Sequence, residues 1–457
     1  MTLVAFFACE EQKAPPSIET ASWREDPFLD SLQHRTFNFF WDTTPSKNGL
    51  TPDRYPTETF SSVAAVGFAL TALPIGVERG FITREQARGR TLATLRFFWN
   101  SPQSPDATNV TGYKGFYYHF LDPDTGHRFK TVELSSIDTA LLLAGVLFVQ
   151  SYFESGQPAE KEIRALADSI YQRVDWQWFR PRPPLVSMGW HPERGFNTSD
   201  WTGYMESMIL YILALGSPTY PVEPEVWQKW TSTYIWAPYY GNEFVSFGPL
   251  FGHQYSHCWI DFRGIRDAYM REKGIDYFEN SRRATYSQQA YAAENPKGFK
   301  GYSDLIWGFS ACDGPGDVRL TIDGTERRFA GYAARGVSFD WVLDDGTLTP
   351  TAAGGSLPFA PEICVPALKA MKDLMGTRIW GEYGFRDAFN LTFVDDRHPD
   401  GWIDKDYLGI DQGPILIMAE NLRTEFVWET MKKNSYIREG LRKAGFTGGW
   451  LDEIRKQ

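Results

Sequence analysis

Four carboxylates stand close to the points where strongly apolar segments of the chain begin. Glu133 and Asp138 lie in VELSSIDTALLLAGVLF, Glu206 lies in YMESMILYILALGSP, and Asp411 lies in YLGIDQGPILIMAEN. Each is expected at or near the N-terminus of an apolar helix, where the backbone N–H groups are unpaired and the helix dipole favours negative charge. Any one of them could be a simple cap or first-turn acid. If the helix ends converge, however, the four acids surround a pocket.

Paired acids in a partly apolar cleft are what the hydrolysis of a glycosidic bond requires. One carboxylic acid protonates the leaving oxygen, and the second carboxylate acts as a base on water or as a nucleophile at the anomeric carbon. Burial raises the pKa of the first group, and hydrogen bonds keep the second ionised. Because Glu206 lies in a segment that is apolar at nearly every position, we expect it to be protonated near neutral pH. It would then be the general acid or position that acid; the alternative is a structural glutamate bonded to a loop amide.

Several loop-like segments carry side chains suited to a polyol, because hydroxyl groups need hydrogen-bonding partners and flat sugar faces stack on rings. His253 and His257 are four residues apart near an acid, but no third ligand is evident, so no metal site is predicted. A hydrogen bond from these histidines to a buried neighbour remains an alternative, and the acidic loop DDRHPDGW is otherwise expected to be solvated. The predicted substrate-binding residues are Tyr118, His119, Asp200, Trp201, His253, Gln254, His257, Trp259, Arg263, Asp313, Asp396, Asp400 and Trp402.

Helical periodicity recurs along the chain and predicts an all-α fold. Apolar helices tend to alternate with amphipathic ones, which is the pattern of two concentric layers, since inner helices are surrounded and outer helices show one polar face to water. Long connections rich in Gly, Trp, Tyr and Asp join the helices, and small hairpins are possible at residues 128–135, 319–329 and 346–355. The predicted helices cover residues 26–41, 60–73, 83–99, 135–153, 159–174, 201–215, 223–235, 261–271, 277–294, 361–375, 411–422 and 425–444.

The composition argues against several classes of function. The chain of 457 residues has a formal net charge of −11, which disfavours nucleic acid and anionic substrates. It contains no glycine-rich phosphate loop followed by Lys and no dinucleotide fingerprint after a strand. Its 17 Trp, 22 Tyr and 33 Phe residues either fill a large core or line a cleft with rings.

The first 25 residues differ from the rest. The opening MTLVAFFACEEQ resembles the end of a bacterial lipoprotein signal, with Cys9 as the lipid-modified residue, although it has no basic region and its apolar run is short. We therefore expect a signal and tether over residues 1–25, one catalytic domain over residues 26–457, and a lipid-anchored protein of the periplasm or cell surface. Cys258, Cys312 and Cys364 are expected to be buried free thiols.

Five motifs in order give the chain a family resemblance. YKGFYYHFLDPDTG, ELSSIDTALLLAG, LFGHQYSHCWIDFRG, SACDGPG and YLGIDQGPILIMAEN together resemble the bacterial glucoamylase-like domain, which includes the endo-β-1,2-glucanases of glycoside hydrolase family 144. The resemblance covers residues 28–441. It implies an (α/α)6 barrel without cofactor that hydrolyses β-1,2-glucan, with inversion, to sophorose or short sophorooligosaccharides. It also carries catalytic roles over to Glu133, Asp138, Glu206 and Asp411.

The sequence leaves several alternative functions open. Residues 386–406 depart from the family pattern and could block one end of the cleft, so endo and exo action are both possible. Another glycosidase or transglycosylase, such as a β-glucosidase, could use the same fold. We expect the protein to be a monomer. A non-catalytic glycan-binding surface lipoprotein would need rings and amides but no opposed carboxylates. A lyase would need Arg and Lys for uronates, to which the net charge gives little support.

Overall fold

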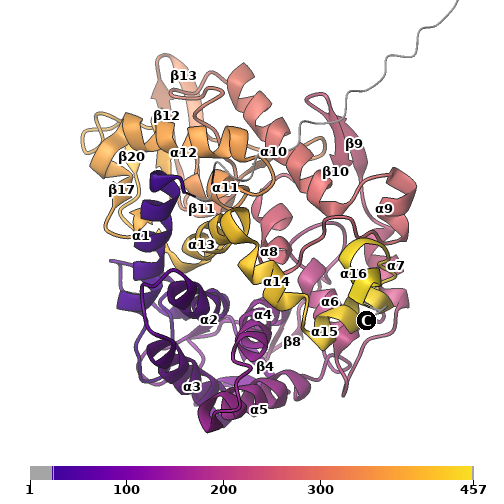
Figure 1. The fold of residues 1–457 in the computed structure, drawn as a ribbon. Helices are drawn as coiled ribbons and strands as arrows, with labels where there is room; N and C mark the ends of the chain where they lie inside the picture. Colours follow the sequence, from indigo (N-terminus) through magenta and orange to yellow (C-terminus); the bar gives the residue numbers. More distant parts are fainter. Residues whose placement is uncertain (1–22, 24, 455–457) are drawn as a thin grey trace, which may run out of the picture.

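The computed structural model describes residue 23 and residues 25–454, and this part of the chain folds mainly into helices (Figure 1). The predicted Cys9 and most of the tether lie outside it. Within the described residues the helices are α1 (Pro27–Thr43), α2 (Val63–Glu78), α3 (Arg84–Asn100), α4 (Ser136–Tyr152), α5 (Pro158–Gln172), α6 (Met208–Gly216), α7 (Glu225–Thr231), α8 (Phe251–Trp259), α9 (Ala268–Lys273), α10 (Tyr277–Glu294), α11 (Pro350–Gly354), α12 (Pro361–Met375), the 3-10 helix η2 (Gly376–Arg378), α13 (Gly409–Thr424), α14 (Phe426–Met431), α15 (Ser435–Lys443) and α16 (Gly449–Glu453).

The helices form an inner and an outer layer. In the inner layer α2 packs on α4, α4 on α6, α6 on α8 and α8 on α13, while α11 packs on α13 and α13 returns to α2. The outer layer pairs α3 with α2, α5 with α4, α15 with α6, α10 with α8, α12 with α11 and α1 with α13. These contacts close a double-layered α/α-barrel, which confirms the all-α, (α/α)6 fold that we expected.

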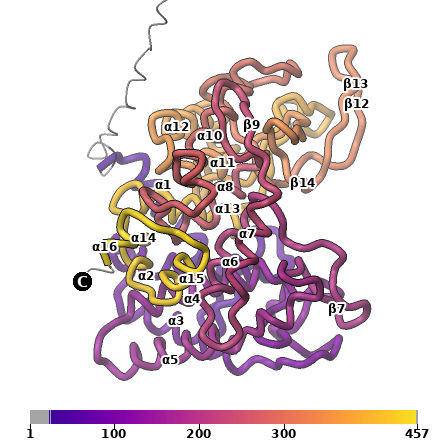
Figure 2. Tube along the Cα trace, turned by 90° about the vertical axis from the view of Figure 1, so that its right-hand side faces the viewer, coloured from indigo at the N-terminus to yellow at the C-terminus, as the bar shows by residue number. Residues whose placement is uncertain are grey.

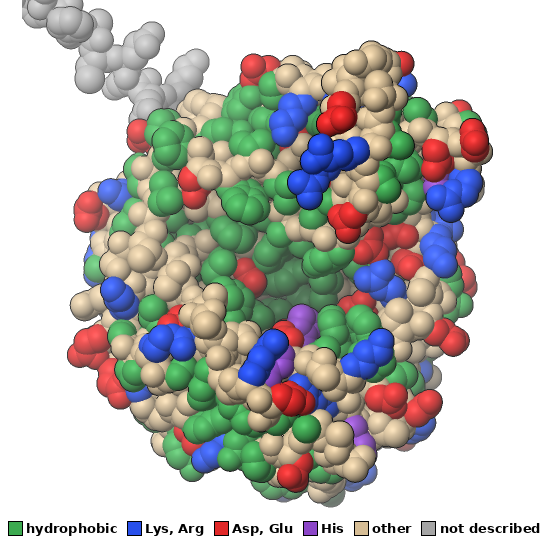
Figure 3. All heavy atoms as spheres, turned by 180° about the vertical axis from the view of Figure 1, so that it is seen from behind, with side chains coloured by type: hydrophobic (Ala, Val, Ile, Leu, Met, Phe, Trp, Pro, Cys, Tyr) green, Lys and Arg blue, Asp and Glu red, His purple; other side chains and the backbone are tan. Residues whose placement is uncertain are grey.

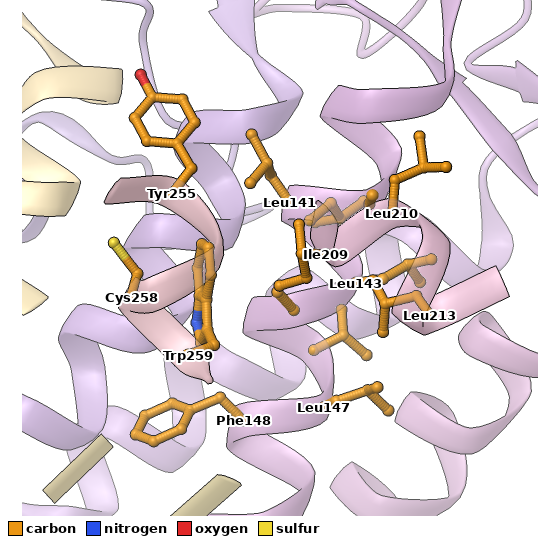
Figure 4. Packing of buried hydrophobic residues seen from close by; sticks show 14 of the residues in the cluster. Leu141, Leu143, Leu147, Phe148, Ile209, Leu210, Leu213, Tyr255, Cys258 and Trp259 are labelled. Carbon is orange, nitrogen blue, oxygen red and sulfur yellow. The ribbon is translucent and has the colours of Figure 1, made fainter. Parts of the chain in front are cut away.

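The inner helices are apolar because they have neighbours on all sides. Residues 208–216 of α6 are all buried, and side chains from α4, α6 and α8 interlock between these helices, among them Phe148, Leu213 and Trp259 (Figure 4). The backbones of α2 and α4 touch where two glycines meet, since a Cβ at Gly145 would lie 2.2 Å from the carbonyl oxygen of Gly67. Close packing therefore fixes the helices that carry the site.

Short antiparallel strands lead directly into three inner helices, β2 into α2, β6 into α4 and β21 into α13. Ser62 and Ser135 cap α2 and α4 by accepting hydrogen bonds from the amides of Ala65 and Asp138. The paired strands are β1 (Arg54–Tyr55) with β21 (Tyr407–Leu408), β2 (Ser61–Ser62) with β5 (Phe120–Leu121), β9 (Trp236–Tyr239) with β10 (Asn242–Val245), β11 (Ala311–Cys312) with β14 (Ala333–Ala334), β12 (Val318–Ile322) with β13 (Thr325–Phe329), β15 (Gly336–Val337) with β16 (Val342–Leu343), β17 (Trp380–Gly381) with β18 (Gly384–Phe385), β19 (Phe389–Asn390) with β20 (Trp402–Ile403), and the sheet β3 (Gly112–Tyr113), β4 (Phe116–Tyr118), β6 (Leu134–Ser135), β7 (Gly189–His191), β8 (Gly195–Phe196).

Most of the predicted helices are present, but several predictions were wrong. Residues 251–259 form α8 where we expected a loop, because the polar side chains of this helix are buried through hydrogen bonds that its sequence does not reveal. Helix α6 begins at Met208 rather than at residue 201, since Trp201 is held in the preceding loop by a hydrogen bond to Ser136.

Three further boundaries also differ from the prediction. Asp267 caps α9, so that helix starts seven residues later than expected, and Asn434 caps α15, which divides the predicted helix over 425–444. Residues 350–354 form α11 instead of a hairpin, with Pro350 in the first turn. The hairpin predicted over 319–329 is confirmed as β12–β13, whereas in the segment 128–135 only β6 forms, and it pairs with β4 and β7.

The strands gather on one side of the barrel. Figure 2 shows β7, β12, β13 and β14 along one edge of the molecule, on the face that Figure 3 presents to the viewer. Among the described residues, no helix combines the length and apolar character that crossing a bilayer requires. Cys258, Cys312 and Cys364 are buried and free, as predicted.

Candidate active site

A cavity of about 450 Å³ lies at the N-terminal ends of the inner helices. The face shown in Figure 3 is hollowed near its centre, where hydrophobic, acidic and histidine side chains adjoin. Helices α2, α4, α8 and α13, the turn before α6 and several loops line the cavity with Asp53, Arg54, Phe60, Ser62, Ala64, His119, Phe120, Ile137, Asp138, Leu141, Glu206, Phe251, Tyr255, Ala311, Tyr332, Leu408 and Ile410. The expected convergence of helix ends is thus present.

His119 joins two of the predicted acids at the cavity wall. Its Nδ1 lies 2.7 Å from Glu133 Oε1, and its Nε2 lies 3.5 Å from Asp138 Oδ1. Burial opposes the charged imidazole, but Asp138 and Glu133 outweigh it and raise the pKa of His119 to about 9. Although burial works in the opposite direction, the hydrogen bond from His119 lowers the pKa of Glu133. This group therefore keeps an ionised Glu133 beside an imidazolium at neutral pH.

Asp138 is the cavity-lining acid of this group. It lies in the first turn of α4, where Ser135 Oγ donates to its Oδ2 at 2.5 Å. Burial raises the pKa of Asp138, while His119 and Ser135 act in the opposite direction. Asp138 also influences the next acid along the wall, Glu206, through its charge.

Glu206 lies on the same cavity wall, and its carboxyl group has a raised pKa. It lies in the turn two residues before α6, not within the helix as we predicted, and its Oε2 is buried without a hydrogen-bond partner among the described residues. Burial, together with the charge of Asp138, raises the pKa of Glu206 to about 7. A carboxyl group with this pKa can donate a proton near neutral pH.

A second group of acids lies behind the cavity wall near Arg54. Asp411, in the first turn of α13, is 4% exposed and in contact with the carboxyl group of Asp387. Burial raises the pKa of Asp411 to about 7. Arg54 Nη1 lies 2.5 Å from Asp313 Oδ2, and Arg54 Nε lies 3.1 Å from Asp53 Oδ2. Arg54 therefore ties this acidic group to the cavity.

Three members of the second group have the chemistry of a hard cation's ligands. Carboxylate oxygens of Asp313, Asp387 and Asp404 all lie within 4.8 Å of one another. Oxygen donors of this kind suit Ca²⁺ or Mg²⁺. Arg54 already compensates Asp313, and the paired acids Asp387 and Asp411 can share a proton instead.

Three of the predicted site residues line the cavity, namely His119, Asp138 and Glu206. Glu133 stands behind His119, while Asp411 and Asp313 belong to the acidic group around Arg54. These six residues come together from segments far apart in the chain. Their catalytic or binding roles stay predictions.

Six other predicted residues do not line the cavity, because their side chains are buried in the core. Tyr118, His253, Gln254, His257 and Trp259 are at most 1% exposed, and Trp201 is 6% exposed. Gln254 Nε2 donates to the Ala352 carbonyl, Trp259 Nε1 donates to Thr71 Oγ1, and His257 contacts Ser281. Burial lowers the pKa of His253 to about 4 and that of His257 to about 3, so both are neutral structural groups.

The remaining predicted residues lie away from the cavity. Asp200 is paired with Arg182, and Arg263 is paired with Asp261 and Glu425. Asp396 is exposed, and Asp400 lines a separate surface cavity with Arg378 and Arg386. Trp402 packs against the small cluster at the β12–β13 hairpin. Ion pairs hold Asp200 and Arg263, and packing holds Trp402, so these side chains do not line the cavity.

Several residues of the site were not predicted from the sequence. Asp53, Arg54, Tyr255, Tyr332 and Asp387 line the cavity or adjoin it. Asp387 lies between aromatic residues in GFRDAFN. An acid within an apolar or aromatic segment is the same pattern that pointed to the four predicted acids, so this residue could have been found. For Arg54 no local signal exists, since its partner Asp313 is 259 positions further along the chain.

Comparison with known proteins identifies the family. A family model described as "Putative glucoamylase" (Glycoamylase) matches residues 198–435, slightly more than half of the chain. The chain belongs to this family. A "putative glucoamylase" from Bacteroides uniformis is 32% identical, with a TM-score of 0.81 over 96% of this chain and 100% of that one. The resemblance to the glucoamylase-like domain is therefore confirmed.

Two further relatives carry names that specify an activity. The endo-β-1,2-glucanase of Chitinophaga pinensis, solved with sophorotriose and glucose, is 28% identical, with a TM-score of 0.79 over 95% of this chain and 100% of that one. The exo-β-1,2-glucooligosaccharide sophorohydrolase of Parabacteroides distasonis is 28% identical over 464 residues, which cover 93% of this chain. The glucoamylase-like chain spans 59% of the length of that relative.

Proposed function

We propose that this member of the glucoamylase-like family is a glycoside hydrolase that cleaves β-1,2-glucan and releases sophorose or short sophorooligosaccharides. The observation that carries the proposal is that the cavity brings Glu206, whose pKa is raised, together with two carboxylates that contact a charged histidine. Glu206 has a pKa of about 7, whereas Glu133 and Asp138 are held against the imidazolium of His119. Hydrolysis of a glycosidic bond needs one acid and one base in this relation. The β-1,2-glucan hydrolases among the relatives support the linkage.

The roles follow from the surroundings of each group. Glu206, protonated below its pKa, donates its proton to the oxygen that leaves with the departing sugar. Before the reaction the imidazolium of His119 stabilises the ionised form of Asp138. Asp138 then accepts a proton from the water that attacks the anomeric carbon and becomes neutral. Phe60, Phe120 and Tyr255 supply apolar walls for the sugar rings.

The test is incubation of the purified protein with β-1,2-glucan, with soluble starch and laminarin in parallel. A ladder of oligosaccharides indicates endo action, and a single disaccharide from the start indicates exo action. Proton NMR during the first turnovers then reads the anomer that is released, and the α-anomer indicates inversion. Binding of β-1,2-glucan without cleavage of any polymer would contradict hydrolysis and favour a glycan-binding protein.

We also propose that Cys9 anchors the protein to a membrane of the periplasm or cell surface. The support is the short apolar run that ends at this cysteine, followed by polar residues. In a bacterial host that processes lipoproteins, labelled palmitate should enter the wild type but not the Cys9→Ser variant. Equal labelling of the two proteins would contradict the anchor.

A further inference from the structure

Exposed aromatic side chains are concentrated in one short segment. Of the eleven large hydrophobic residues that are exposed in the described part of the chain, four fall within residues 332–342. Tyr332, Phe339, Trp341 and Val342 are 57%, 60%, 50% and 49% exposed. Single exposed hydrophobic residues are ordinary, but a cluster on one segment indicates a binding surface.

This segment adjoins the cavity. Tyr332 itself lines the cavity, and it is followed by β14, which pairs with β11, whose Ala311 also lines the cavity. The ring of Trp341 packs against the backbone of Gly248, because a Cβ added at Gly248 would lie 2.6 Å from Trp341 Cδ1. Gly248 is three residues before Phe251, which lines the cavity. The segment that carries the exposed rings therefore begins at the cavity wall with Tyr332, and its Trp341 packs on the backbone that leads into Phe251 of that wall.

Buried polar contacts hold the base of the segment in place. Arg335 is fully buried and donates to the carbonyls of Ala330 and Gly331, both at 3.0 Å, beside Tyr332. Its guanidinium also binds both carboxylate oxygens of Asp345 at 2.8 Å. The backbone that presents Tyr332 is thus fixed before any ligand arrives.

The tip of the segment is fixed as well. Phe339 and Trp341 lie at the turn of the β15–β16 hairpin, where the Ser338 amide donates to the Trp341 carbonyl at 2.8 Å. Asp340, which stands between Phe339 and Trp341 in the sequence, accepts hydrogen bonds from Ser246 and Ser338. Rings on a preorganised hairpin lose little conformational freedom when a ligand stacks on them.

We propose that Tyr332, Phe339 and Trp341 form an aromatic platform that binds the part of a β-1,2-glucan chain lying outside the cavity. This inference rests on the proposed function. A cavity of about 450 Å³ cannot enclose a polymer, so the remainder of the chain crosses the rim, where these rings lie. Aromatic faces stack on the apolar faces of sugar rings and are tolerant of chain length. The platform would therefore increase affinity for long chains and leave the reaction of short ones unchanged.

The experiment compares the double variant Phe339→Ala/Trp341→Ala with Trp99→Ala, which removes a ring of 40% exposure from the end of α3. The substrates are β-1,2-glucan and the shortest sophorooligosaccharide that the wild type cleaves. We expect the double variant to raise KM for the polymer about threefold to tenfold. Its kcat/KM for the short substrate and both constants of Trp99→Ala should stay within about twofold of the wild type.

Two results would overturn the platform. One is a KM of the double variant for the polymer that stays at the wild-type value, or that changes no more than its KM for the short substrate does. The other is a wild-type dimer in size-exclusion chromatography that the double substitution dissociates, because the patch would then bind a second copy of the chain. A melting temperature measured for each variant shows whether it is folded.

Failure of the proposed function can be told apart from failure of the platform. If the wild type cleaves neither substrate, migration of the same proteins through native gels containing β-1,2-glucan tests the platform directly. If β-1,2-glucan in the gel slows the wild type, and slows the double variant less, the platform is supported even though no hydrolysis occurs. Equal migration of wild type and double variant overturns it.

Discussion

At the residue scale, the proposed hydrolysis depends most on the protonation of Glu206. Glu206→Gln keeps the size of the side chain but removes the proton that leaves with the product. We expect kcat on β-1,2-glucan to fall about 10²- to 10⁴-fold while the protein stays folded. Glu225→Gln, an exposed change in the first turn of α7, should keep wild-type activity. Substantial turnover by Glu206→Gln would remove Glu206 from the mechanism.

The pH dependence of the rate should report the same group. Because Glu206 must be protonated and its pKa is about 7, kcat/KM should be lost as the pH rises above 7, about tenfold per pH unit. His119, whose pKa is raised to about 9, stays charged up to about pH 8 and loses its proton only at the end of the range. Initial rates between pH 5 and pH 9 test this expectation. A profile that is flat from pH 6 to 9 would contradict a general acid of this pKa.

Stability should depend on pH through the same side chain. The pKa of Glu206 rises from 4.5 to about 7 on folding, so between these values the folded state holds a proton that the unfolded chain has released. The free energy of unfolding therefore falls as the pH rises from about 4.5 to 7. Gln does not titrate, so Glu206→Gln should show a shallower fall over this window in urea titrations. Parallel pH curves for variant and wild type would contradict this linkage.

Local chemistry could be predicted from sequence where it depends on near neighbours. Ser135 and Asp138 are three positions apart, so the capped turn that holds an acid at the start of α4 is visible in the sequence. The pairing of Arg54 with Asp313 joins segments that only the fold brings together, and so it could not be predicted. His253 and His257 were predicted to bind substrate because they are polar. In the structure they contact the Phe247 carbonyl and Ser281 inside the protein, and nothing in the sequence indicates these buried partners.

At the element scale, the crossing of α2 and α4 determines where Asp138 stands. The carbonyl oxygen of Gly67 would be 2.2 Å from a Cβ at position 145. Gly145→Ala should therefore force the helices apart and lower the free energy of unfolding by about 1–3 kcal/mol, with a loss of activity. Gly89→Ala, in α3 with open space around it, should be neutral or stabilise by about 0.5–1 kcal/mol. Urea unfolding separates the two changes; equal effects would contradict the close contact.

Elements were predictable when one face or one cap dominated their sequence. The bounds of α10 and α12 agree with the prediction because Asp276 caps the first and Pro361 opens the second. Helix α8 was missed because its stability comes from side chains that find partners on other helices, such as Gln254 on Ala352 and Ser356 of the α11 region. Periodicity carries no information about such contacts.

At the scale of the whole molecule, the barrel is closed by contacts between its first and last long helices. Glu420 of α13, 1% exposed, accepts hydrogen bonds from Gln33 of α1 at 2.8 Å and from Arg79, after α2, at 2.6 Å. Thr424 also donates to Glu420, at 2.6 Å. One buried carboxylate thus joins α1, α2 and α13, whose sequence positions are up to 387 residues apart.

Removing this carboxylate should weaken the entire barrel in a single step. Glu420→Ala leaves Arg79 and Gln33 without their shared partner, so we expect a loss of about 3–5 kcal/mol in the free energy of unfolding. Glu429→Ala, which removes an exposed partner of Lys432, should cost at most about 1 kcal/mol. Because Glu420 lies nine residues beyond Asp411, roughly 14 Å along α13, activity at low temperature should survive. Circular dichroism and tryptophan fluorescence should give coincident urea transitions for the variant. Separate transitions, or a loss no greater than that of Glu429→Ala, would mean that the barrel does not depend on this closing contact.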